Sequence, residues 1–270
     1  MTEARRRGDV IAHRTGKGAA ALVVHPGFLD DATVWHTFAD LAAEADLDVA
    51  LLEPAGVGGR AGAPGPYTLQ RMADDAGAVV DSLGKPCVVV GQSMGAQVAE
   101  LVAAPRAESV RGLVLVTPVP LAGTRLPDAD IAPFRALGGQ CGSQRAVRTQ
   151  LSVSNSPETL DLLVESGVRI APPVVAALAD AWNDGDPAGE APSNYRGPVL
   201  VVRGAGDGFV TDEMVRGGVI PRFAELRTAL VEQAGHWPHA EQPASLAAAV
   251  LSFVAQVTAA GSLDLGGAGR

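Results

Sequence analysis

The sequence has few cysteines and almost no lysine. Cys87 and Cys141 are the only two cysteines among 270 residues, too few for a disulfide framework, so a cytoplasmic protein is expected. Lys17 and Lys85 are the only lysines, and the net charge is −9. The one basic run is the arginine triplet at 5–7. An acidic chain with so little clustered positive charge is not expected to bind nucleic acid or an anionic membrane surface.

Long hydrophobic runs are also missing. No segment approaches the roughly 20 apolar residues that a membrane-spanning helix needs, so no membrane association is expected. The arginine triplet is not followed by an apolar segment, which favours a short solvated N-terminus over a signal peptide. Hydrophobic residues still make up 47% of the chain, which excludes a disordered or fibrous protein. The length suits one large α/β domain as well as two small ones.

Short apolar runs alternate with helical periodicity over the first 116 residues. The pattern predicts strands at 21–25, 49–52, 88–91 and 113–116, and helices at 31–45, 68–83 and 96–104. Continuous rather than alternating apolar strands are typical of a parallel sheet covered on both faces. Strand–helix–strand repetition predicts an α/β fold with a doubly wound, mostly parallel sheet.

This rhythm breaks near Pro118. The segment 121–195 carries helical patterns, including helices near 157–167 and 172–182, and no convincing strand. Strands resume at 199–202 and 226–231, and a last helix is expected over 243–257. The predicted organisation is therefore a core of residues 1–120 and 196–258, a helical insert at 121–195 and a flexible tail at 259–270.

The segment Gly91-Gln92-Ser93-Met94-Gly95 lies between a predicted strand and a predicted helix. The G-x-S-x-G spacing is common by chance in a glycine-rich chain, but this context makes it specific. A serine on a sharp strand-to-helix turn is lifted above the sheet, while the flanking glycines let neighbouring chains pass closely. The motif indicates a nucleophilic serine. The structural alternative is that Ser93 only caps a helix that begins at Ala96.

A serine nucleophile needs a base. His236 follows the last predicted strand, on a loop that returns to the carboxyl edge of the sheet, where Ser93 is also expected. His239 on the same loop is the main competitor, and it could instead pair with Glu241 or face water. His25, at the end of a strand, is expected to be a structural histidine.

The base needs an acid that fixes its tautomer. Asp207 follows the strand predicted at 199–202, so it too should reach the carboxyl edge. The alternative is an ordinary Asp-Gly turn formed with Gly208.

The chain order Ser93, Asp207, His236, each after a strand, is that of α/β-hydrolases. The sequence resembles this superfamily over nearly its whole length, and in particular its serine-nucleophile, esterase-like branch with a helical cap. The similar segments are the oxyanion loop at 25–28, the Asp-x-x-Gly-x-Gly loop at 53–58, where Glu53 replaces the usual aspartate, and the histidine loop at 236–243. The insert at 121–195 occupies the place of the family's variable cap.

One departure affects the oxyanion hole. Pro26 is inserted between the histidine and the glycine of the first loop, and proline has no N–H to donate. The resemblance therefore assigns the first oxyanion donor to the backbone N–H of Phe28, with Leu29 as the alternative. It assigns the second donor to the backbone N–H of Met94, next to the serine.

The resemblance implies hydrolysis of a carboxylic ester, lactone or thioester of a small, largely apolar substrate through an acyl-enzyme. The same residues are also compatible with perhydrolysis and carbon–carbon cleavage. Alternatives on the same fold are a ligand-binding signalling protein and a non-hydrolytic lyase with a retained triad. The cap is expected to set substrate choice and not the chemistry. Phe134 and Trp182 in the cap, together with Trp237, are the candidate substrate contacts.

No metal or other cofactor is expected. The set His236, His239 and Glu241 could mimic metal ligands, but Pro238 makes that loop geometry unfavourable. The glycine-rich segment 56–62 lacks the Lys-Ser or Lys-Thr of a phosphate-binding loop. The expected partner is a small-molecule substrate, and the sequence leaves a homo-oligomer open.

Overall fold

The computed structural model describes residues 3–7 and 10–264, in which eight strands form one sheet. The strands are β1 (Glu3–Arg7), β2 (Val10–Thr15), β3 (Ala21–His25), β4 (Asp48–Leu52), β5 (Cys87–Gln92), β6 (Val110–Val116), β7 (Val199–Gly204) and β8 (Leu226–Val231). Their order across the sheet is β1-β2-β4-β3-β5-β6-β7-β8. Neighbours from β4 to β8 pair in parallel, whereas β2 is antiparallel to β1 and β4. The predicted α/β class with a mostly parallel sheet is confirmed.

The N-terminal edge of the sheet differs from the prediction. The segment interpreted as a short solvated N-terminus contains β1 and β2, which form an antiparallel pair. Strand β2 then pairs with β4, more than 30 residues further along the chain. The segment has no continuous apolar run that would indicate a strand, and the pairing of β2 with β4 depends on residues far along the chain.

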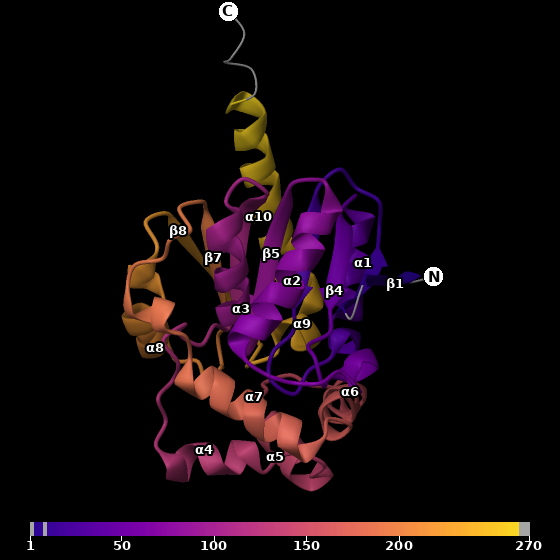
Figure 1. Cartoon of the computed structure of the whole chain (residues 1–270), viewed down its shortest axis with the longest axis vertical. Helices are drawn as coiled ribbons and strands as arrows, with labels where there is room; N and C mark the ends of the chain where they lie inside the picture. The colour runs from indigo at the N-terminus through magenta and orange to yellow at the C-terminus, as the bar shows by residue number, and fades with distance from the viewer. Residues whose placement is uncertain (1–2, 8–9, 265–270) are drawn as a thin grey trace, which may run out of the picture.

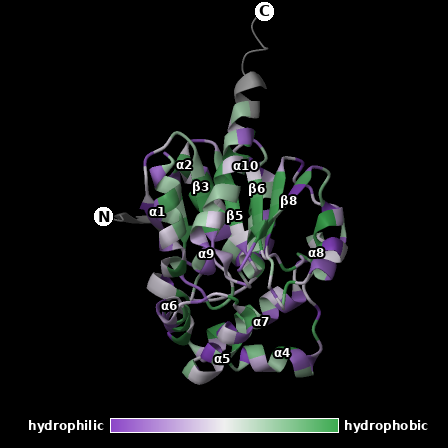
Figure 2. Cartoon of the chain, turned by 180° about the vertical axis from the view of Figure 1, so that it is seen from behind, coloured by the Kyte–Doolittle hydropathy of each residue, from purple (hydrophilic) through white to green (hydrophobic). Residues whose placement is uncertain are grey.

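Helices cover both faces of the sheet (Figures 1 and 2). Helices α2 (Leu69–Leu83), α3 (Met94–Ala103) and α8 (Asp212–Gly218) pack on one face, and α1 (His36–Glu44) and α10 (Pro243–Asp264) on the other. Successive strand residues serve opposite faces: Val23 belongs to the first apolar cluster and Val24 to the second. Both faces are therefore dry, which explains the continuous apolar runs.

The insert between β6 and β7 contains helices and lies at the end of the sheet opposite to the end of α10 (Figure 1). Its helices are α4 (Asp128–Arg135), α5 (Cys141–Leu151), α6 (Pro157–Val168) and α7 (Pro172–Asp184). We call α4 to α7 the cap. Helix α6 begins after Ser156, whose side chain accepts a hydrogen bond from the N–H of Thr159, as expected for an N-cap.

Short helical elements connect the longer ones. They are the 3-10 turns η1 (Ala32–Trp35), η2 (Gly58–Arg60), η3 (Ala104–Arg106), η4 (Pro187–Glu190) and η5 (Ile220–Arg222), and helix α9 (Pro238–Glu241). The helix predicted at 31–45 is therefore η1 followed by α1. Helix α10 runs on to Asp264, into the segment predicted as a flexible tail, and the rest of that tail lies outside the described residues.

Within residues 3–7 and 10–264, no single helix is both long and apolar enough to cross a membrane. One pair of helical segments, 157–168 and 172–190, meets the length and composition criteria only when taken together, and the pair is bent by 100°.

His25 ends β3 as a buried residue, 2% exposed, with Nδ1 2.8 Å from the carbonyl oxygen of Pro26. Burial lowers the pKa of His25 from 6.5 to about 4. The imidazole is therefore neutral in the folded protein over a pH range in which the unfolded chain takes up a proton.

This difference predicts how stability responds to acid. The contribution of His25 is complete above pH 6.5 and is lost as the pH falls to about 4. Each unit of difference between the pKa of His25 in the unfolded and in the folded state is worth about 1.4 kcal/mol. We therefore expect the free energy of unfolding to fall by about 3 kcal/mol between pH 6.5 and about 4. Urea unfolding at stepped pH measures it. In the variant His25→Asn, the free energy of unfolding should fall by about 3 kcal/mol less over the same pH range. The same fall in the variant and the wild type would show that His25 does not cause it.

Candidate active site

Ser93 occupies a sharp turn between β5 and α3. Its backbone angles are φ 52° and ψ −117°, a strained conformation for a residue with a side chain. A Cβ on Gly91 would lie 2.0 Å from the carbonyl oxygen of Gly95, and a Cβ on Gly95 would lie 2.5 Å from the carbonyl oxygens of His25 and Pro26. Only glycine fits at these two positions, which explains the G-x-S-x-G spacing.

The turn also excludes the structural alternative for Ser93. Helix α3 begins at Met94, two residues earlier than predicted, and Ser93 occupies its N-cap position without making a side-chain cap bond. The hydroxyl is free for another partner.

That partner is His236. Its Nε2 lies 3.0 Å from the Oγ of Ser93, and its Nδ1 lies 2.9 Å from Oδ2 of Asp207. Ser93 follows β5, Asp207 follows β7 and His236 follows β8, so three loops at the carboxyl edge of the sheet meet here. Each residue is 6% exposed. The structure thus brings together all three residues that the sequence singled out.

Asp207 is oriented through its other oxygen. Oδ1 accepts hydrogen bonds from the N–H groups of Phe209 at 2.9 Å and Val210 at 3.0 Å, which leaves Oδ2 for His236. Burial by itself raises the pKa of the Asp207 carboxyl, but the charge of His236 and the hydrogen bonds from His236 and the two backbone groups outweigh it. The pKa therefore lies below its ordinary value, and the carboxylate is charged.

Sequence reasoning missed two residues that hold His236. Gln92, a variable position of the serine motif, donates through Nε2 to the carbonyl oxygen of His236 at 2.9 Å. The hydroxyl of Thr117, after β6, donates to the same oxygen at 3.1 Å. Their residue types carry no signal of this role, because the carbonyl they contact is more than 100 residues away in the sequence.

His239 and Glu241 have other partners than the sequence suggested. The ring of His239 stacks on Trp35 with centroids 4.0 Å apart, and burial lowers the pKa of His239 well below its ordinary value. The carboxylate of Glu241 accepts instead from backbone N–H groups, those of Val153, Ser154, Gly235 and Trp237. His239 therefore neither pairs with Glu241 nor faces water. Among the described residues, His236, His239 and Glu241 do not form a group that could hold a metal ion.

The proposed oxyanion donors have no competing partner. Within the described parts of the chain, the backbone N–H groups of Phe28 and Met94 make no hydrogen bond to another residue. Phe28 lines the same cavity as Ser93. The loop that carries it is tight, since a Cβ on Gly27 would lie 2.0 Å from Oε1 of Gln92, and Leu29 has a φ of 67°.

A cavity of about 40 Å³ adjoins Ser93 and His236. Phe134, Trp182 and Trp237, the candidate substrate contacts, line it together with the residues Phe28, Leu29, Leu137, Gln144, Val147, Arg148, Leu151 and Phe209. Trp182 is the centre of an aromatic cluster, with ring centroids 6.0 Å from Phe28, 5.4 Å from Phe134 and 5.7 Å from Phe209. The wall is thus mostly apolar, with Arg148 and Gln144 as polar exceptions.

A larger depression of about 740 Å³ lies elsewhere, at the amino ends of β3, β4 and β5. Ala20, Leu47 and Val254 line it. Ser93, Asp207 and His236 lie at the carboxyl ends of their strands, so the smaller cavity is the candidate active site.

Comparisons with known proteins agree with this architecture. A family profile described as "Alpha/beta hydrolase family" matches residues 22–249, and the chain belongs to that family. An esterase from Thermogutta terrifontis has a similar structure, with a TM-score of 0.76 at 24% identity over 92% of this chain and 94% of that one. An enol-lactonase from Burkholderia xenovorans has a TM-score of 0.79 at 20% identity, over 94% of this chain and 100% of that one. A bromoperoxidase from Bacillus anthracis has a TM-score of 0.79 at 16% identity, over 91% of this chain and 95% of that one. At these identities the likeness establishes the fold and no activity.

The two hydrogen bonds to Oδ1 make Asp207→Asn a sharp test of the acid. In Asp207→Asn, the N–H groups of Phe209 and Val210 keep the amide oxygen at the position of Oδ1. The NH2 group of the amide therefore faces Nδ1 of His236 and donates to it. Nε2 is then protonated and cannot accept the proton of Ser93. We expect kcat for an activated ester to fall by about four orders of magnitude.

The matched control is Asp212→Asn, which alters an exposed carboxylate paired with Arg203 and Arg216 at the start of α8. It should leave kcat unchanged. A loss of less than tenfold in Asp207→Asn would place the orienting acid elsewhere.

Proposed function

We propose that this chain is a serine hydrolase that cleaves a carboxylic ester, lactone or thioester of a small, largely apolar substrate. The observation that supports this most directly is the hydrogen-bonded chain from Ser93 through His236 to Asp207, beside two backbone N–H groups that have no partner among the described residues. The structurally similar proteins include one described as an esterase and one described as an enol-lactonase, which supports this class of reaction.

The geometry supports a two-step acyl transfer. Ser93 Oγ attacks the acyl carbon while Nε2 of His236 takes the hydroxyl proton. The N–H groups of Phe28 and Met94 stabilise the negative oxygen of the tetrahedral intermediate. His236 then protonates the leaving alcohol or thiol, and a water molecule activated by the same nitrogen releases the acid. Asp207 keeps Nδ1 protonated and Nε2 available throughout.

The cavity favours a short acyl group. About 40 Å³ is far below the roughly 300 Å³ at the lower end of ligand pockets, and its wall is dominated by aromatic and aliphatic side chains. Arg148 is the one cationic side chain among the lining residues, and it is already paired with Asp30. A small neutral acyl group therefore suits this cavity better than a highly charged one.

Ser93→Ala tests the proposal. Removal of the nucleophile should lower kcat on the order of a millionfold and abolish labelling by a fluorophosphonate, while the circular dichroism spectrum stays that of the wild type. The measurement is a panel of p-nitrophenyl esters, lactones and thioesters. Near-wild-type turnover in the variant would remove Ser93 from the mechanism. A stoichiometric burst without turnover in the wild type would favour a signalling receptor.

The aromatic cluster predicts a dependence on acyl chain length. Each buried methylene is worth roughly 0.8 kcal/mol, so kcat/KM should rise about fourfold per carbon until the cavity is full and then fall. Phe134→Ala or Trp182→Ala should move the optimum to longer chains, with less effect on the acetate ester. Leu162→Ala, at an exposed position of the cap, is the control and should leave the profile unchanged. A flat profile in all four proteins would mean that the cap does not select the substrate.

A further inference from the structure

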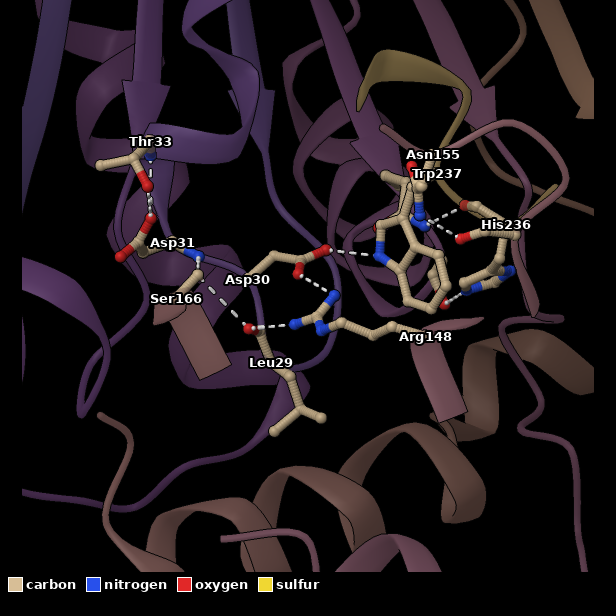
Figure 3. A network of polar contacts seen from close by, with 12 residues as sticks. Leu29, Asp30, Asp31, Thr33, Arg148, Asn155, Ser166, His236 and Trp237 are labelled. Carbon is tan, nitrogen blue, oxygen red and sulfur yellow. Dashed lines mark hydrogen bonds and ion pairs between the residues drawn. The ribbon is translucent and has the colours of Figure 1, made fainter. Parts of the chain in front are cut away.

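Arg148 is a buried cationic side chain on cap helix α5, 1% exposed. Its Nη1 forms an ion pair with Oδ1 of Asp30 at 2.9 Å, and its Nη2 donates to the carbonyl oxygen of Leu29 at 2.8 Å (Figure 3). Its guanidinium carbon also lies 5.0 Å from the ring centroid of Trp237. One cap residue thus contacts two separate loops of the core.

The first of these loops carries the proposed oxyanion donor. Leu29 and Asp30 directly follow Phe28, and Leu29 has the left-handed φ of 67°, so the loop needs anchors to hold this shape. Cap helix α6 provides another anchor, because Ser166 Oγ accepts from the N–H of Asp31 at 2.7 Å. The residues that follow Phe28 are therefore held by two helices of the cap.

The second loop carries His236. Oδ2 of Asp30 accepts a hydrogen bond from Nε1 of Trp237 at 3.0 Å, as Figure 3 shows, so Asp30 links Arg148 to the residue beside the histidine. The end of the same helix touches this loop again, because the carbonyl oxygen of Leu151 accepts from the N–H of His236 at 2.8 Å. Helix α5 therefore bridges the oxyanion loop and the histidine loop.

Such a buried ion pair is a poor way to stabilise a cap. Desolvation of the two charges offsets most of their attraction, and apolar residues of similar volume often stabilise a protein equally well. A guanidinium differs from an apolar side chain in its geometry, because its rigid planar fork can pair with a carboxylate and donate to a carbonyl at the same time, as Arg148 does with Asp30 and Leu29. The arrangement is suited to holding two loops in register.

We propose that Arg148 is a positioning residue for the reaction: it holds the loop 28–30 so that the Phe28 N–H points at the oxyanion. The proposal rests on the proposed hydrolase function. It extends the role of the cap from substrate choice, as the sequence suggested, to the geometry of the chemical step. Helix α5 and the catalytic loops then form one unit, and the oxyanion hole is complete only with the cap closed.

The test compares Arg148→Met with Arg145→Met, which removes an exposed arginine of the same helix paired with Asp161. A donor displaced by about 1 Å costs on the order of a hundredfold, so we expect kcat of Arg148→Met to fall by about that factor while KM changes less than twofold. Arg145→Met should behave as the wild type. A boronic acid, whose tetrahedral adduct places an oxygen in the oxyanion hole, should bind weaker by the same factor, and the product carboxylic acid should not.

A second variant guards against misfolding, since Arg148→Met leaves Asp30 buried without its cation. Arg148→Met combined with Asp30→Asn removes both charges and retains an acceptor for Trp237. It should be folded, with a kcat loss close to that of the single variant, because both changes break the same link. Wild-type kcat in this folded double variant would overturn the proposal.

A readout without turnover separates this proposal from the proposed function. Amide hydrogen exchange of the ligand-free protein should be at least tenfold faster over residues 28–31 in the double variant than in the wild type, and unchanged in Arg145→Met. If the wild type hydrolyses no ester, the proposed function fails and the exchange rates alone decide whether Arg148 holds the loop. If the wild type is active and exchange at 28–31 is unaffected, the positioning role fails alone.

Discussion

The strained turn at Ser93 is the constraint on which the other features of the site depend. A residue with a φ of 52° costs about 1–3 kcal/mol and persists only where its surroundings over-determine it. Here β5 lies in the middle of a sheet with two dry faces, and Gly91 and Gly95 allow backbone contacts that any side chain would prevent. The turn brings the hydroxyl to the carboxyl edge, where the loops after β7 and β8 also end.

Buried polar side chains then set the positions of these loops. Gln92 and Thr117 both donate to the carbonyl oxygen of His236. The carboxylate of Glu241 accepts hydrogen bonds from the N–H groups of Gly235 and Trp237, on either side of the histidine. Each of these groups would be costly to bury alone, so together they favour one loop conformation. These contacts hold the backbone at and around His236, and the two ring nitrogens remain available for Ser93 and Asp207.

In the proposed mechanism, the cap connects substrate selection with this geometry. Aromatic residues from α4 and α7 line the cavity of about 40 Å³, which is small for a ligand pocket. Arg148 on α5 contacts the core loops at the same time. A cap that closes around a fitting acyl group would therefore complete the site in the same motion, as expected of an enzyme that uses binding energy to align its catalytic groups.

The sequence by itself determined the fold class and the family, and it singled out Ser93, Asp207 and His236, which the structure brings together. It could do so because the strained turn needs glycines at fixed spacing and because parallel strands deliver their following loops to one edge. Only the tertiary structure decided that His239 stacks on Trp35, that β2 pairs with β4, and that Arg148 reaches Asp30. These contacts join residues far apart in the chain, and an arginine or a histidine looks the same in the sequence whether it faces water or a buried partner.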